Sequence, residues 1–165
     1  ELAGLERIDS PKPYYGSRYT DSTRNYLAKA VDEFWYYDLG DLGYTFSAYP
    51  AGGGRSSRKT VFSPSAMGAK QQYYAFMGGD YPYCRIDREA AGGRRIAVVK
   101  DSYANAFIPW LIPHFEQIHV IDPRHYEGSL QSLVRDEGIT DLLFMDYALV
   151  LGIPPYAEAI RGILQ

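Results

Sequence analysis

The stretch RRIAVVKDSYANAFIPWLIPHF, residues 94–115, decides how the rest of the sequence is interpreted. Its apolar run, Ile96 to Val99, is typical of a strand that is covered on both faces of a sheet. The run ends at a polar turn that contains Ser102, and a helical pattern follows. Several hydrolase families place a nucleophilic serine on such a strand-to-helix turn, whereas a helix that only needs an N-cap uses the same residue type.

Composition limits the class of protein. The chain has 165 residues, 46% hydrophobic and 22% charged, which indicates a single globular domain spanning 1–165 or a fragment of a larger protein. A net charge of -3 gives no reason to expect nucleic acid or an anionic membrane as a partner. The one cysteine, Cys84, excludes an internal disulfide and a cysteine-based metal cluster. The sequence contains no apolar run of membrane-spanning length and no signal peptide at its start, where an initiator Met is also missing.

The pattern of the sequence changes near Arg94. Residues 1–93 are irregular and rich in tyrosine and glycine, and the whole chain has 16 tyrosines. Periodicity and turn-forming residues predict elements in this part as follows: a helix over 21–37, a strand over 43–50, a flexible loop over 51–58, a second strand over 59–63 and a helix over 63–79.

Residues 94–165 read as a βαβαβ core. The expected strands are 95–100, 117–122 and 139–152, and the expected helices are a proline-interrupted one from 103, one over 128–138 and one over 156–164. Strands that alternate with helices at this spacing predict right-handed crossovers and a parallel sheet.

Each of the three expected strands ends in an aspartate, namely Asp101, Asp122 and Asp146. Parallel sheets place ligands and chemistry at the carboxyl ends of their strands. One such aspartate is more often a helix cap or turn former than a catalytic group. Three at one edge favour a cleft there, without fixing the reaction.

At these residues the sequence resembles the C-terminal part of the DHHW family of bacterial proteins. The resemblance extends mainly over residues 73–145, and its most specific pieces are the motifs KDSYANAF, HVIDPRHY and FMGGDYP. That family is related to SGNH-type esterases and to acetyltransferases that modify secreted polysaccharides. The resemblance implies a flavodoxin-like three-layer α/β sandwich with a mainly parallel sheet, an extracytoplasmic location, and Ser102 in the position of the nucleophile.

The residues around Ser102 suit acyl transfer. At a helix N-terminus, free backbone N–H groups favour negative charge and can stabilise an oxyanion. Gly79, with Gly78 before it, would let backbone approach a substrate, although a helix C-cap and turn explains this glycine pair equally well. The candidate oxyanion-stabilising and substrate-binding residues are Asp101, Gly79, Tyr103 and Tyr147.

The sequence departs from the family at the residues that would supply the catalytic base. The Asp-His-His-Trp motif that gives the family its name is absent, and in RYTDSTRNYLAKA, residues 18–30, Ser22 to Arg24 stand where the two histidines and the tryptophan would be. A hydroxyl or a guanidinium cannot act as a general base near neutral pH. Either the catalytic half has decayed, or this alignment is spurious and the segment lies outside the sequence.

The chain offers three histidines as replacements. His114 follows a proline at a helix end, and His119 lies inside an expected strand. His125 follows Asp122 with the Asp-x-x-His spacing that SGNH hydrolases use to activate their serine. DHHW relatives usually carry an aromatic residue at the position of His125, so a turn or surface histidine is the alternative. Ser102, His125 and Asp122 are therefore the candidate catalytic residues.

Two functions remain open. One is an SGNH-like esterase or O-acyltransferase that acts on a secreted or cell-surface polysaccharide and needs no cofactor. The other is an inactive DHHW relative that binds glycan or a partner protein, for which Tyr103 and Tyr147 are the best-placed aromatic residues. No spacing of His, Cys, Asp or Glu forms a set of metal ligands, and AGGGRSSR lacks the ending of a phosphate-binding loop.

Overall fold

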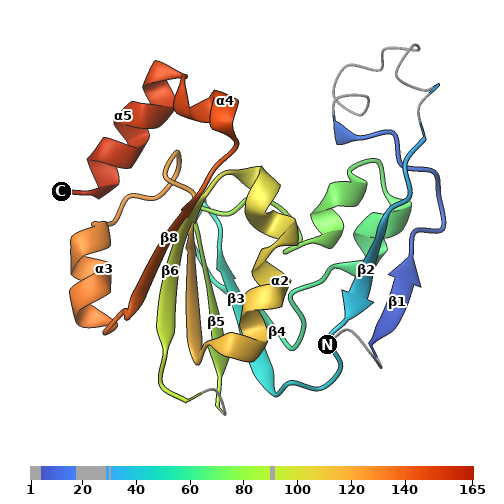
Figure 1. Ribbon diagram of the computed structural model, residues 1–165, viewed down its shortest axis with the longest axis horizontal. Helices are drawn as coiled ribbons and strands as arrows, with labels where there is room; N and C mark the ends of the chain where they lie inside the picture. Colours follow the sequence, from blue (N-terminus) through green and yellow to red (C-terminus); the bar gives the residue numbers. More distant parts are fainter. Residues whose placement is uncertain (1–4, 18–28, 30, 90–91) are drawn as a thin grey trace. The chain divides into compact units, whose positions relative to one another are not determined.

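A computed structural model describes residues 5–17, 29, 31–89 and 92–165, and the chain divides into two compact units (Figure 1). The first unit comprises Glu1–Asp41 and Val61–Gly79, and the second comprises Leu42–Thr60 and Asp80–Gln165. The expectation of a single domain over 1–165 stays a prediction.

The second unit is built on a six-stranded sheet of order β4-β3-β5-β7-β6-β8. Its strands are β3 (Tyr44–Tyr49), β4 (Ser56–Arg58), β5 (Tyr83–Arg88), β6 (Arg95–Lys100), β7 (Gln117–Ile121) and β8 (Asp141–Met145). The pairs β4–β3, β3–β5 and β5–β7 are antiparallel, and the pairs β7–β6 and β6–β8 are parallel. Three parallel strands are therefore present in 94–165 as expected, but the third is shorter than predicted: the strand expected over 139–152 is β8 over Asp141–Met145 only, and Ala148–Leu151 form a helix instead.

The predicted fold class is nevertheless wrong. The sheet is mixed and its antiparallel pairings outnumber the parallel ones, so this is not a flavodoxin-like sandwich with a mainly parallel sheet. The error arises from β5, which sequence analysis did not identify. In β5, Cys84 and Ile86 are buried while their neighbours Arg85 and Asp87 are half-buried, which is the alternation of an antiparallel strand with one wetter face.

The helices of the second unit are short and lie on both sides of the sheet (Figure 1). They are η4 (Ser102–Ala106), α2 (Ile108–Leu111), η5 (Ile112–His114), α3 (Leu130–Asp136), α4 (Ala148–Leu151) and α5 (Pro154–Ile163). Pro109 and Pro113 fall at the first turns of α2 and η5, where a missing N–H costs little, so the expected interrupted helix is three short pieces.

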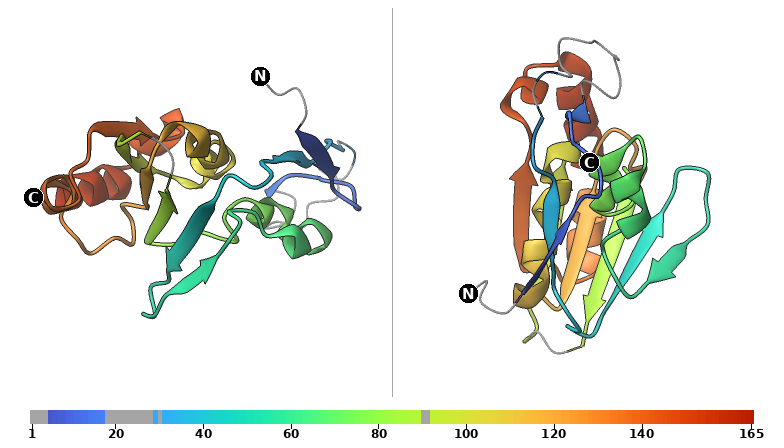
Figure 2. Two further views of the ribbon diagram at one scale, coloured as in Figure 1. Left: turned by 90° about the horizontal axis from the view of Figure 1, so that it is seen from below. Right: turned by 90° about the vertical axis from the view of Figure 1, so that its right-hand side faces the viewer.

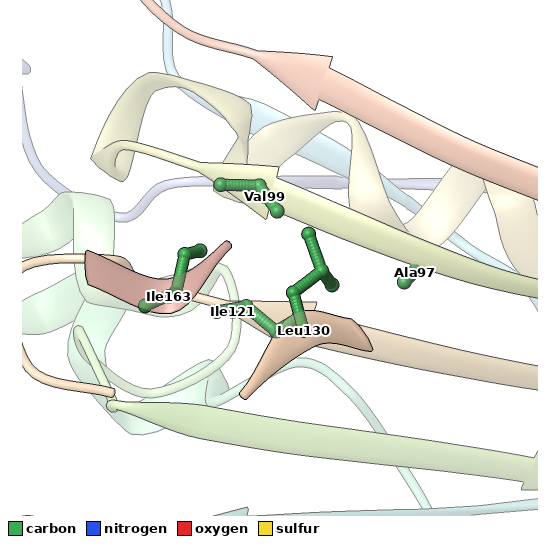
Figure 3. Close-up of a cluster of buried hydrophobic side chains, with 5 residues drawn as sticks. All are labelled: Ala97, Val99, Ile121, Leu130 and Ile163. Carbon is green, nitrogen blue, oxygen red and sulfur yellow. The ribbon is translucent and has the colours of Figure 1, made fainter. Parts of the chain in front are cut away.

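One face of β6 and β7 carries a hydrophobic core against α3 and α5. Leu130 from α3 and Ile163 from α5 are 2% and 3% exposed and pack with side chains of the sheet (Figure 3). Those partners are Ala97, Val99 and Ile121. Val98 and Lys100 alternate with these on β6, so they point to the other face, where they are also buried. Both faces of β6 are thus covered, as its continuous apolar run predicts.

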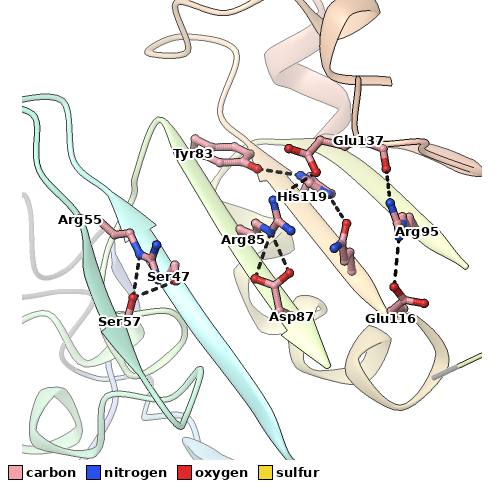
Figure 4. A network of polar contacts seen from close by, with 11 residues as sticks. Ser47, Arg55, Ser57, Tyr83, Arg85, Asp87, Arg95, Glu116, His119 and Glu137 are labelled. Carbon is pink, nitrogen blue, oxygen red and sulfur yellow. Dashed lines mark hydrogen bonds and ion pairs between the residues drawn. The ribbon is translucent and has the colours of Figure 1, made fainter. Parts of the chain in front are cut away.

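Beside this core, polar side chains form a paired set on the sheet that we call the face network (Figure 4). His119 is fully buried, and its Nδ1 lies 2.7 Å from the Tyr83 hydroxyl. Arg85 donates to Asp87 and to Glu137, with N–O distances of 2.8 and 3.1 Å. The remaining members of the network are Arg95 and Glu116.

Burial dominates the electrostatics of this network. It lowers the pKa of His119 to about 4, and the charge of Arg85 adds to the effect, so the imidazole is neutral at neutral pH. Burial also raises the pKa of the Tyr83 hydroxyl, which stays protonated. The network holds β5, β6 and β7 together with α3.

The first unit contains β1 (Glu6–Asp9) and β2 (Trp35–Asp38), which pair antiparallel, and two 3₁₀ helices, η2 (Pro64–Gly68) and η3 (Gln72–Ala75). Figure 2 shows these elements from two further directions. Aromatic rings fill the interior of this unit: Tyr36 stacks on Phe62 with centroids 4.1 Å apart, and Phe34 meets Phe76 edge-on. Many tyrosines and phenylalanines here therefore serve packing.

Several predictions for residues 1–93 were wrong. The helix expected over 21–37 is strand β2 at its end, and residues 21–28 and 30 of it lie outside the described residues. The expected strand 59–63 and loop 51–58 are displaced, since β4 is Ser56–Arg58. The expected helix 63–79 consists of η2 and η3 only. The strand expected over 43–50 is confirmed as β3.

Candidate functional site

The carboxyl ends of β6, β7 and β8 bring together the three aspartates expected there. The Asp146 carboxyl feels the negative charges of both Asp101 and Asp122, which places all three close to one another. Burial, followed by these charges, raises the pKa of Asp146, while a hydrogen bond from the Tyr156 hydroxyl opposes the rise. The expectation that three strands end in aspartates at one edge is confirmed.

Ser102 follows β6, the middle one of the three parallel strands, and begins η4. Ser102 is half-buried, and among the described residues its hydroxyl has no hydrogen-bond partner. The preceding residue, Asp101, is the N-cap, so the hydroxyl of Ser102 is not used for capping. A partly exposed serine with an uncommitted hydroxyl is compatible with a nucleophile.

Asp101 holds the turn in place. Its carboxylate is 3% exposed, and its two oxygens accept from the N–H groups of Tyr103 and Tyr147 at 2.9 and 3.0 Å. These bonds tie the end of β6 to the segment after β8. Because both oxygens are engaged with backbone, Asp101 acts on the site by positioning the turn, and the expectation of direct substrate contact remains a prediction.

The backbone amides at this turn are less free than expected. The N–H of Tyr103 donates to the Asp101 side chain, and that of Ala104 donates to the Asp101 carbonyl at 3.3 Å. Moreover, η4 is a five-residue 3₁₀ helix, so it lacks the aligned dipoles of a long α-helix. These two amides are therefore engaged within the turn, and stabilisation of an oxyanion here stays a prediction.

The candidate base and its carboxylate are not joined. His125 is exposed, and among the described residues its ring forms no hydrogen bond with Ser102 or Asp122. Asp122 is 0% exposed and instead accepts from Arg124, through the backbone N–H at 3.1 Å, Nε at 2.9 Å and Nη2 at 2.5 Å. The Asp-x-x-His spacing thus gives an Asp-x-Arg ion pair, and the catalytic role of His125 stays a prediction.

The pairing with Arg124 keeps the Asp122 carboxylate ionised. Burial alone would raise the pKa of Asp122, but the hydrogen bonds and charge of Arg124, together with the charge of Lys100, lower it below the usual range. The hydrogen bond to Asp122 likewise raises the pKa of Arg124. Both groups are ionised at neutral pH.

A second group of buried polar residues lies close to Ser102. Lys100 and Asn105 are each 1% exposed, and both approach Asp80 Oδ1, at 3.7 Å from Lys100 Nζ and 3.0 Å from Asn105 Nδ2. Lys100 Nζ and Asn105 Oδ1 have no hydrogen-bond partner within the described part of the chain. In a 3₁₀ helix residues i and i+3 eclipse, so Asn105 lies on the same side of η4 as Ser102.

Together these residues form what we call the edge cluster. Its members are Asp80, Lys100, Asp101, Ser102, Asn105, Asp122, Arg124 and Asp146. Sequence analysis gave no role to Asp80 and Asn105. Asn105 had one detectable signal, its spacing of three from Ser102 in a turn of 3₁₀ helix.

Tyr103 and Tyr147 come together at the same edge. Their rings stack with centroids 4.7 Å apart and an interplanar angle of 21°, and the residues are 60% and 39% exposed. Gly79, the remaining candidate, belongs to the first unit and has a φ of 148°, which glycine tolerates and other residues rarely adopt. Its predicted role in the site stays a prediction, whereas the backbone angle explains the glycine.

Comparison with known proteins agrees with the motifs at this edge. The model of the family described as DHHW protein matches residues 59–121. The resemblance to the DHHW family is confirmed. The structure of a DHHW family protein from Eubacterium siraeum is similar with a TM-score of 0.83 and 26% identity, over 100% of this chain and 55% of that one.

Two structures of PatB1 from Bacillus cereus share the fold of this chain. The one described as having a sulfonyl adduct has a TM-score of 0.75 and 22% identity, over 94% of this chain and 51% of that one. The other has a TM-score of 0.71 and 21% identity, over 94% and 53%. The chain spans about half the length of these structural relatives. Curated protein sequences give no match.

The described residues also bear on two other classes of site. No helix there combines the length and apolar character needed to span a bilayer. No group of three or more His, Cys, Asp or Glu side chains in that part of the chain is arranged to hold a metal ion.

Proposed function

We propose that this chain carries the nucleophile-bearing part of an SGNH-like esterase or O-acyltransferase that acts on a secreted or cell-surface polysaccharide. The observation that carries the proposal is Ser102, half-buried after the middle one of the three parallel strands, with a hydroxyl that the described residues leave without a hydrogen bond. The likeness to DHHW proteins supports the same assignment.

The chemistry would proceed in two steps. Ser102 Oγ attacks the carbonyl carbon of an acyl donor, its proton passes to a base, and the donor's alcohol leaves with a proton. The acyl group then passes from Ser102 to water in an esterase, or to a sugar hydroxyl in an acyltransferase. The similarity to a PatB1 structure with a sulfonyl adduct supports a nucleophilic centre, because sulfonyl reagents form adducts with nucleophilic side chains.

The base would be His125 or a histidine outside this sequence. Asp122 is engaged with Arg124, so His125 would act without the carboxylate that orients the imidazole in a triad. The alternative, a histidine supplied by another segment, is in keeping with relatives about twice as long as this chain. The same likeness, and the kind of substrate, favour an extracytoplasmic location.

Covalent labelling of Ser102 tests the proposal. A fluorophosphonate probe loses fluoride when it phosphonylates an activated serine, and mass spectrometry locates the modified residue. We expect labelling of the wild-type protein at Ser102 and none in Ser102→Ala. Labelling that persists in Ser102→Ala, or a wild-type protein that stays unmodified, would count against the enzyme. His125→Gln, with the exposed His114→Gln as matched control, tests the base.

A second function is favoured by the exposed tyrosine pair. Stacked Tyr103 and Tyr147 present aromatic surface on which a sugar ring can pack. If the chain is an inactive relative that binds glycan or a partner protein, saccharide binding should survive Ser102→Ala and fall in Tyr103→Ala. Equal binding by wild type and Tyr103→Ala would remove the basis for this alternative.

A further inference from the structure

Arg124 is held in a fixed orientation. Its Nε and Nη2 donate to the two oxygens of Asp122, a carboxylate that is fully buried. A guanidinium has five N–H donors in one plane, so this side-on pairing uses two of them. The rigid fork geometry fixes the direction of the other three.

The outer edge of this guanidinium is open. The Arg124 side chain is 40% exposed, and among the described residues Nη1 makes no hydrogen bond. One donor of Nη1 and the second donor of Nη2 therefore face away from Asp122 as a parallel pair. Such a pair suits a ligand oxygen or two adjacent ligand oxygens.

Arg124 and the tyrosine pair lie on opposite sides of Ser102. The strand order is β7-β6-β8, so Arg124 follows one neighbour of the serine-bearing strand and Tyr147 follows the other. Neighbouring strands are about 4.8 Å apart, which puts the two flanking strand ends about 10 Å apart, roughly the length of two sugar rings. A short saccharide can thus reach both.

The net charge of the edge cluster is negative. The edge cluster contains four carboxylates, of Asp80, Asp101, Asp122 and Asp146, and two cations, of Lys100 and Arg124. Arg124 also feels the charge of Asp80 in addition to that of Asp122. Its own positive charge is consequently offset, while its outward N–H groups keep their ability to donate. An anionic ligand would be repelled by the net charge, and a neutral oxygen acceptor would not.

We propose that the edge cluster binds an uncharged glycan, with Arg124 donating to its hydroxyl or acetamido oxygens and the Tyr103–Tyr147 stack supporting a sugar ring. This inference rests on the proposed function, because it names the substrate class of the same site. It assigns acidic polysaccharides, whose sugars carry carboxylates, to the disfavoured class.

Binding measurements on the Ser102→Ala protein test the charge preference without turnover. Calorimetric titrations would use two uncharged probes, cellotriose and tri-N-acetylchitotriose, and one acidic probe, trigalacturonate, at low and high salt. We expect at least one uncharged probe to bind about fivefold or more tighter than trigalacturonate at low salt, with the difference shrinking as salt screens the charges. Tighter binding of trigalacturonate, or no binding of either uncharged probe, would overturn the inference.

Two variants test the role of Arg124. Arg124→Lys keeps a cation beside Asp122 but removes the fork, and we expect about a tenfold loss of affinity for the uncharged probe with folding retained. Arg135→Lys is the matched control: Arg135 donates from Nε and Nη2 to Asp136 in the same way, but on an exposed face of α3. An unchanged affinity in Arg124→Lys would contradict the assignment.

The outcomes separate this inference from the proposed enzyme. Arg124-dependent binding of an uncharged glycan together with an unlabelled Ser102 would retain the binding site and discard the enzyme. A labelled Ser102 with a preference for trigalacturonate would do the reverse.

Discussion

The face network and the edge cluster are two polar groups on the same sheet, and they differ in how completely they are paired. In the face network, His119 meets Tyr83, and Arg85 meets both Asp87 and Glu137. In the edge cluster, Lys100 Nζ, Asn105 Oδ1 and the Ser102 hydroxyl have no hydrogen-bond partner among the residues that the structure describes.

This difference predicts different roles for the two polar groups. Buried polar groups in a folded protein are normally satisfied, because each unpaired one costs about 1–3 kcal/mol. The face network meets that requirement and connects strands and a helix. The edge cluster does not, and it lies where the three parallel strands β7, β6 and β8 end beside exposed aromatic rings. We therefore expect changes to the paired groups, which include the Asp122–Arg124 pair of the edge cluster, to affect folding according to their burial, and changes to the unpaired or exposed groups of the edge cluster to affect binding and chemistry more.

The largest effect should come from acidifying the face network. His119 has a folded-state pKa of about 4, below its ordinary value of 6.5, so the unfolded chain binds a proton more readily. The free energy of unfolding should then be constant above about pH 6.5 and fall by about 3 kcal/mol as the pH drops towards 4. Urea denaturation at a series of pH values measures this loss.

Variants of two histidines distinguish this origin from general acid sensitivity. His119→Gln lacks the titrating group, so its stability, although lower at neutral pH, should change little between pH 6.5 and 4.5. His114→Gln removes an exposed histidine and should keep the wild-type slope. Carboxylates with lowered pKa, such as Asp122, lose their contribution only at lower pH. A His119→Gln protein with an unchanged slope would refute the assignment.

Burial on both faces or on one face explains which strands could be predicted from the sequence. The run Ile96 to Val99 is covered on both faces, so its pattern is continuous and the strand was found with its correct bounds. In β5 the alternation of Cys84 and Ile86 with charged neighbours is only one short stretch, and Arg85 and Asp87 make it resemble a loop. Its antiparallel pairing with β7 depends on contacts distant in sequence, which local pattern does not encode.

For the candidate site, the residues at the strand ends could be predicted from the sequence, but their hydrogen-bond partners could not. The aspartates at the carboxyl edge and the neighbouring Tyr103 and Tyr147 follow from strand positions alone, and the structure brings them together. The partner of Asp122 did not follow, because the spacings Asp-x-Arg and Asp-x-x-His overlap in one turn. Arg124 reaches the carboxylate with both Nε and Nη2, which is a stronger interaction than a single imidazole contact.

The next effect compares two similar ion pairs. Asp122 and Asp87 each bind an arginine two residues away, but the Asp122 side chain is 0% exposed and the Asp87 side chain is 42% exposed. Asp122→Asn should lower the free energy of unfolding by about 2 kcal/mol, since a buried charge-assisted pair is broken. Asp87→Asn should cost under about 1 kcal/mol. Chemical denaturation of both variants provides the comparison, and equal losses would contradict the assigned burial.

A smaller change isolates one hydrogen bond of the face network. Tyr83→Phe keeps the ring and removes the hydroxyl that lies 2.7 Å from His119 Nδ1. We expect a loss of about 1 kcal/mol in stability, measured by denaturation, and no change in covalent labelling of Ser102. Reduced labelling in a protein that is still folded would mean that the two polar groups are coupled.

The smallest effect on stability should come from the ring most exposed at the edge. Tyr103 is 60% exposed, and its substitution by alanine removes little buried surface, so the free energy of unfolding should stay within about 0.5 kcal/mol of wild type. Binding of an uncharged trisaccharide should nevertheless weaken several-fold, because half of the Tyr103–Tyr147 stack is lost. Tyr74→Ala is the control, since Tyr74 is also exposed, at 39%, but belongs to the first unit. If Tyr103→Ala instead destabilised the protein and left binding intact, the edge cluster would resemble the face network, and the distinction between the two would no longer hold.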